Sequence, residues 1–171
     1  LHLDEKFDID CGNVMNELNR QLLNANFEKG IVLHLETQPW SAEDVARNLA
    51  NYERLFGFIN INPLDKDAED KLNYGVKKLN FIGLKLHPRL QCYDLNNEKV
   101  SKLCKVAGDL GIPVLIDAFP DGTHLMQGFS PLKYSNLALN CSNTNFIWAH
   151  MGGHYVLDFM MLAKRLQNVF M

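Results

Sequence analysis

Polar residues that can act as acids, bases or ligands follow several short apolar runs of this sequence. Polar and apolar residues alternate over 83–87, so Lys85 and His87 share one face of an extended chain. Asp117 and His150 each end an apolar run. Such groups cost several kcal/mol when left unpaired in an apolar medium, so we expect them to be paired, metal-bound or solvated in a cleft.

His2, in Leu-His-Leu-Asp at 1–4, has the same polar character. Each of these five residues also has an ordinary structural interpretation. His2 can be a solvated residue near a chain end, and His150 a hydrogen-bonded core histidine before a glycine turn. Lys85 can lie on the surface, His87 in a loop held by Pro88, and Asp117 can cap the loop that follows it.

Two further polar residues share one face of an earlier run. His34 and Glu36 could join the site, but a buried pair formed by these two side chains explains them equally well.

Short β-branched or aromatic runs alternate with stretches of helical period, which is typical of βα units around a parallel sheet. The predicted strands are 30–36, 57–62, 81–88, 112–119 and 145–150. Helices are predicted to start at Asn13, at Ser41 and at Ser130. Another has Val100, Leu103, Cys104 and Ala107 on one side and ends near 108–111.

The two ends of the chain look incomplete. Residues 1–4 resemble the end of a strand, and 168–171 resemble the start of another. With the five strands above this gives seven strand positions, whereas a closed (β/α)₈ barrel needs eight strands and about 250 residues. We expect one partial domain, 1–171, whose open sheet edges predict poor solubility or association, the latter as a homo-oligomer.

Composition excludes several classes of function. The 171 residues are 47% hydrophobic, with 17 basic and 20 acidic side chains and a formal net charge of -3. This balance supplies no cationic field for nucleic acid or for an anionic membrane. No apolar stretch approaches the roughly 20 residues of a spanning helix, and acidic residues occupy the place of a secretion signal. We therefore expect a cytoplasmic protein whose four cysteines are reduced and mostly buried.

Three segments together resemble a known family. They are Ile-Gly-Leu-Lys-Leu-His-Pro at 82–88, Gly-Ile-Pro-Val-Leu-Ile at 111–116 and Ile-Trp-Ala-His-Met-Gly-Gly at 147–153. Their order and spacing resemble the amidohydrolase-related TIM-barrel metal hydrolases and decarboxylases. The resemblance implies an α/β fold, a distorted (β/α)₈ TIM-like barrel that is incomplete at both ends in this chain.

The resemblance also implies roles for individual residues. His2 matches the second histidine of the family's first-strand His-x-His motif, and His150 matches the histidine of the sixth strand, both as ligands of a divalent metal such as zinc. Lys85 and His87 would contact an anionic group of a small-molecule substrate. Asp117, the expected catalytic carboxylate, stands where the family usually has a histidine.

The aspartate leaves two interpretations open: a metal site with harder ligands, or a member that has lost its metal. The first predicts a metal-dependent hydrolase of a small amide, ester or lactone that uses a metal-activated water, or a decarboxylating lyase of the same family. The second predicts a metal-free barrel homologue that acts as a binding or interaction protein. A nucleotide-binding α/β domain is disfavoured because no glycine-rich phosphate loop follows any strand.

Overall fold

A computed structural model describes residues 10–120 and 128–171 of the chain. Within these residues six strands form one sheet in the order β1-β2-β3-β4-β5-β6. Each neighbouring pair of strands is parallel. The strands are β1 Gly30–Leu33, β2 Leu55–Asn60, β3 Gly83–Leu86, β4 Val114–Asp117, β5 Phe146–Ala149 and β6 Val169–Phe170.

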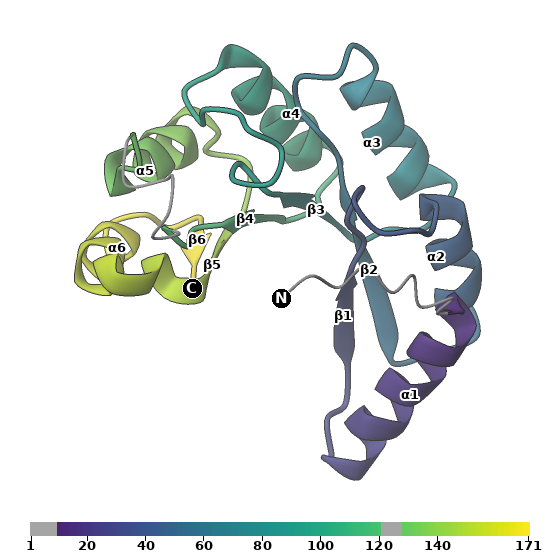
Figure 1. Ribbon diagram of the computed structural model, residues 1–171. Helices are drawn as coiled ribbons and strands as arrows, with labels where there is room; N and C mark the ends of the chain where they lie inside the picture. Colours follow the sequence, from purple (N-terminus) through teal and green to yellow (C-terminus); the bar gives the residue numbers. More distant parts are fainter. Residues whose placement is uncertain (1–9, 121–127) are drawn as a thin grey trace, which may run out of the picture.

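In the described part of the chain one helix precedes β1, the other five connect successive strands, and together they cover one side of the sheet (Figure 1). They are α1 Cys11–Asn24, α2 Ala42–Leu49, α3 Ala68–Lys77, α4 Glu98–Asp109, α5 Pro131–Asn140 and α6 Val156–Ala163, with a short 3₁₀ segment η1 at His150–Tyr155. In Figure 1 the sheet curves and the helices lie on its convex side, with β1 and β6 at its two ends. Sequential parallel strands with outer helices are the arrangement of a (β/α)₈ barrel, of which the described residues form an open part.

The predicted elements are largely confirmed. All five predicted strands are present: four are shorter than predicted, β2 has the predicted length but begins two residues earlier, and residues 169–170 form a further short strand. The strand predicted at 1–4 lies outside the described residues. Ser41 and Ser130 cap α2 and α5 as predicted, because each side chain accepts a hydrogen bond from a backbone N–H of the first turn.

The predicted start of the first helix was wrong. Asp10, not Asn13, is its N-cap, and the Asp10 carboxylate accepts a hydrogen bond from the backbone N–H of Asn13 at 2.9 Å. Both residue types cap helices well, so the sequence pattern alone favoured neither position.

A continuous apolar core lies between the sheet and the helices. Leu84, Leu86, Ile116, Phe146 and Trp148 from the central strands are fully buried. The four residues predicted for the buried side of α4 are all buried as well. This packing fixes the central strands, and therefore the positions at which their carboxyl ends present polar side chains.

Gly83 illustrates how closely β2 and β3 approach. A Cβ atom at Gly83 would lie 2.5 Å from the Phe58 ring, so Gly83→Ala is expected to lower the free energy of unfolding by about 1–3 kcal/mol in urea denaturation. Gly30→Ala is the control, because its nearest contact is the flexible end of Leu22 at 2.6 Å. An equal loss in both variants would contradict this explanation.

Cys11, Cys104 and Cys141 are buried free thiols and Cys92 is an exposed one, so the prediction of reduced, mostly buried cysteines is confirmed. Among the described residues, no helix has both the length and the apolar character needed to cross a membrane.

Candidate functional site

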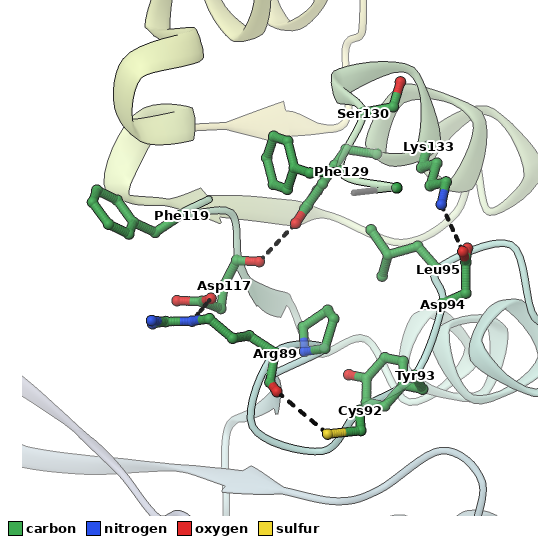
Figure 2. Close-up of a pocket in the computed structure, with 13 residues that line it drawn as sticks. Arg89, Cys92, Tyr93, Asp94, Leu95, Asp117, Phe119, Phe129, Ser130 and Lys133 are labelled. Carbon is green, nitrogen blue, oxygen red and sulfur yellow. Dashed lines mark hydrogen bonds and ion pairs between the residues drawn. The ribbon is translucent and has the colours of Figure 1, made fainter. Parts of the chain in front are cut away.

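Asp117 is the centre of a polar cluster at the carboxyl ends of the strands. It is the last residue of β4, and its side chain is only 2% exposed. Its Oδ2 lies 3.3 Å from Nε of Arg89, which donates a hydrogen bond to it, and 3.7 Å from Nδ1 of His87. Its Oδ1 lies 3.1 Å from Nε2 of His150. Figure 2 shows the Arg89 guanidinium reaching the Asp117 carboxylate across one end of a cavity.

The two carboxylate oxygens of Asp117 are held differently. Oδ2 accepts the Arg89 hydrogen bond, whereas Oδ1 is buried and accepts none. The 3.1 Å approach of His150 is close enough for an ion pair but falls short of hydrogen-bond geometry. A buried carboxylate oxygen without a hydrogen bond costs free energy. We therefore infer that Asp117 Oδ1 is available to a ligand, a water molecule or an ion.

The backbone after β5 is unusual. His150 and Met151 have φ values of 61° and 53°, and Gly152 and Gly153 follow at 78° and 57°. Positive φ costs little for glycine but is uncommon for histidine and methionine. The sharp turn keeps the half-exposed His150 ring beside Asp117, and Phe119 packs edge-on to that ring at 5.7 Å. Strain of this kind is often retained at functional sites.

Tyr134 of α5 is hydrogen-bonded to the backbone at the end of β4. Its hydroxyl donates a hydrogen bond of 2.9 Å to the backbone carbonyl of Asp117, and burial raises the pKa of this phenol. The hydroxyl therefore remains a donor throughout the neutral range. The Tyr134 ring packs edge-on against Trp148 and Phe159, so the hydrogen bond from its hydroxyl connects the Asp117 backbone to the aromatic core.

Lys85 lies in β3 and His87 directly follows this strand, and both are buried. Burial lowers the pKa of Lys85 to about 8, although the Asp117 carboxylate partly offsets this effect. Burial also lowers the pKa of His87, again against the influence of Asp117. The backbone N–H of Leu90 donates to Nδ1 of His87 at 3.4 Å, which leaves the ring proton on Nε2.

A cavity of about 340 Å³ opens beside Asp117. At one end it meets Arg89 and Asp117, and at the other end Lys133 forms a 2.6 Å ion pair with Asp94. Aromatic and aliphatic side chains form much of the wall between them: Tyr93, Leu95, Phe119, Phe129 and Tyr134. The cavity is large enough for a small organic molecule with a polar group at either end.

Four of the five residues singled out from the sequence are therefore brought together. His87 and His150 flank Asp117, and Lys85 lies close enough for its charge to be felt there. The fifth, His2, lies outside the described residues. His34 is buried, but Glu36 is exposed and accepts a hydrogen bond from Gln91, so of the two interpretations left open for these residues the buried pair is wrong.

Sequence reasoning missed Arg89 and Tyr134. Arg89 follows His87 and Pro88 directly, and that proximity was the one signal that could have suggested it. Tyr134 carries no such signal, since it is 17 residues from Asp117 and reaches it through the packing of α5.

The half-exposed His150 ring offers a nitrogen of the kind that binds a divalent metal ion, and the unpartnered Asp117 Oδ1 lies 3.1 Å from its Nε2. However, residues 10–120 and 128–171 contain no group of three or more His, Cys, Asp or Glu side chains placed to hold an ion. The described residues therefore do not by themselves form a complete metal site.

The fold and the polar cluster together define a partial TIM barrel with an active-site-like centre at its carboxyl face. A family model described as amidohydrolase matches residues 34–171. The chain belongs to the amidohydrolase family. No curated protein matches the sequence.

Solved structures share this fold at low sequence identity. An uncharacterised TIM-barrel protein from Bordetella bronchiseptica aligns with a TM-score of 0.79 and 16% identity, over 91% of this chain and 57% of its own. A probable 2-pyrone-4,6-dicarboxylic acid hydrolase from Acinetobacter baumannii, with citric acid bound, has a TM-score of 0.63 and 15% identity. The alignment covers 98% of this chain and 60% of the hydrolase. A 5-carboxyvanillate decarboxylase from Novosphingobium aromaticivorans, with bound manganese, has a TM-score of 0.62 and 15% identity. The alignment covers 85% of this chain and 53% of the decarboxylase. The chain thus spans between half and two thirds of these proteins.

Proposed function

We propose that this chain carries the reaction centre of a metal-dependent hydrolase that cleaves a small amide, ester or lactone bearing a carboxylate. The observation that carries the proposal is the buried Asp117 carboxylate, whose Oδ2 is fixed by Arg89 while Oδ1 accepts no hydrogen bond. A fixed carboxylate with one available oxygen is suited to taking a proton from an attacking water.

His150 and His2 would hold the ion, with Asp117 Oδ1 beside them. Bound there, a divalent ion such as zinc or manganese would lower the pKa of a water molecule toward about 7 and polarise the substrate carbonyl. The manganese bound in the similar decarboxylase supports a divalent metal in general.

The remaining steps belong to side chains of the chain itself. Asp117 Oδ1 takes the proton of the attacking water and returns it to the leaving group. Lys85 and the Arg89 guanidinium attract the substrate carboxylate, and the neutral His87 ring can donate a hydrogen bond from Nε2. The apolar walls of the 340 Å³ cavity would cover the uncharged part of the substrate.

Decarboxylation is the second candidate. Two cationic side chains near a single carboxylate would orient a substrate carboxylate equally well for loss of carbon dioxide, and one similar structure is a decarboxylase. The two reactions differ in their products, so they can be separated by experiment.

The intact protein should be tested with 2-pyrone-4,6-dicarboxylate as a lactone probe and 5-carboxyvanillate as a decarboxylation probe. We expect stoichiometric zinc or manganese by elemental analysis, loss of the pyrone absorbance on turnover, and inactivation by a chelator that added metal reverses. Carbon dioxide release from the second probe alone would favour the lyase. Absence of bound metal after supplementation, with no turnover of either probe, would favour the metal-free binding protein.

A further inference from the structure

The turn that carries Arg89 is compact. In this turn, residues 87–93, the backbone N–H of Gln91 donates to the His87 carbonyl at 3.0 Å, and that of Tyr93 donates to the Pro88 carbonyl at 3.2 Å. Cys92 has a φ of 52°, and its thiol lies 3.8 Å from the Arg89 carbonyl. Because these bonds close the turn around Arg89, we expect a displacement of Gln91 to move Arg89 as well.

Gln91 fastens this turn to the neighbouring strand ends. Its amide Nε2 donates to Glu36 Oε2 at 2.8 Å, and its Oε1 accepts a hydrogen bond from Asn60 Nδ2 at 3.1 Å. Asn60 Oδ1 in turn accepts from the backbone N–H of Glu36 at 3.2 Å. The three hydrogen bonds close a loop among residues from three segments, through two side-chain bonds and one bond from the Glu36 backbone, and we call it the Glu36–Asn60–Gln91 cluster.

Asn60 is the buried member of this cluster and adds a hydrogen bond to β3. It is the last residue of β2, it is 4% exposed, and its Nδ2 also donates to the Lys85 carbonyl at 2.9 Å. The cluster therefore connects the carboxyl ends of β1, β2 and β3. Arg89, which extends from the same turn as Gln91, makes the connection to Asp117 at the end of β4.

We propose that Gln91 is a positioning residue that holds the Arg89 guanidinium against Asp117 Oδ2 through the Glu36–Asn60–Gln91 cluster. The inference rests on the proposed function, in which Arg89 and Asp117 meet the substrate. The Arg89 side chain is long and 29% exposed, so its place depends on the backbone that carries it. Holding such a group in advance removes an ordering cost from binding and catalysis.

The test is the NMR signal of the Arg89 Nε–H in the intact protein labelled on arginine, assigned by its absence in Arg89→Lys. A guanidinium held at one carboxylate is expected to give a resolved peak, whereas a mobile one merges with the exposed arginines. We expect Gln91→Leu, which removes both amide hydrogen bonds at similar size, to lose the resolved peak. Lys99→Met is the matched control, because it removes one hydrogen bond, from Lys99 Nζ to the Leu64 carbonyl, away from this turn.

A charge exchange keeps the test decisive if Gln91→Leu fails to fold. Gln91→Glu alone places two carboxylates together and should lose the peak. Combined with Glu36→Gln it restores one amide opposite one carboxylate, and the peak should return. The proposal is overturned if Gln91→Leu keeps the wild-type peak, if the exchange does not restore it, or if Lys99→Met loses it too. No turnover is measured, so failure of the proposed reaction on both probes leaves this result readable.

Discussion

Asp117→Asn is expected to lower kcat by about 100- to 10,000-fold on whichever of the two probes the intact protein turns over, the range that loss of one acid–base group usually causes. The amide has the shape of the carboxylate but cannot take a proton from water. Arg89 and Lys85 remain in place, so binding of a carboxylated ligand should not weaken. Removing the competing negative charge should even strengthen it, which can be measured with citrate by calorimetry.

The split between rate and binding separates a catalytic role of Asp117 from a structural one. Asp65→Asn is the control, since it removes a partly exposed carboxylate that pairs with Lys71 at 2.7 Å and should change kcat little. Equal losses of kcat and citrate affinity in Asp117→Asn would indicate that the carboxylate only organises its neighbours. An unchanged kcat would end the proposal that it moves a proton.

The sequence was sufficient for the fold because the signals were local. Strands such as 146–149 are short apolar runs between turn residues, and Ser41 and Ser130 mark helix starts through contacts within one turn. Parallel topology then follows from the alternation of strands and helices. The rule that strand ends gather polar groups also brought His87, Asp117 and His150 to one place correctly.

The parts of the site that could not be predicted depend on contacts between distant segments. Arg89 lies beyond β3, in a turn whose shape depends on the positive φ of Cys92 and on Gln91, which bonds to residues 31 and 55 positions away. Likewise, the left-handed backbone at His150 decides that its ring meets Asp117. No propensity of histidine indicates that conformation, because it is held by the surrounding structure rather than preferred by the residue.

Lys85→Met is expected to raise the free energy of unfolding at pH 7 by about 3 kcal/mol, even though it removes a proposed substrate contact. Lys85 is 3% exposed, and burial lowers its pKa from 10.5 to about 8. At pH 7 the folded protein therefore keeps a charge in surroundings that disfavour it. Methionine has a similar length and no charge to desolvate, so the fold should gain stability as function is lost.

The stability gained by Lys85→Met is expected to depend on pH, because the pKa of Lys85 differs between the folded and the unfolded chain. Between about pH 8 and 10.5 the unfolded chain binds the Lys85 proton more tightly than the folded chain, so the wild-type stability contributed by this group rises across that window. The advantage of Lys85→Met should thus be full below about pH 8 and disappear near pH 10.5. Urea denaturation of both proteins at matched pH values measures the difference, in which other titrating groups cancel. Lys99→Met, at an exposed lysine, should show no such trend. An advantage independent of pH, or a less stable variant at pH 7, would mean that partners such as Asp117 fully compensate the buried ammonium.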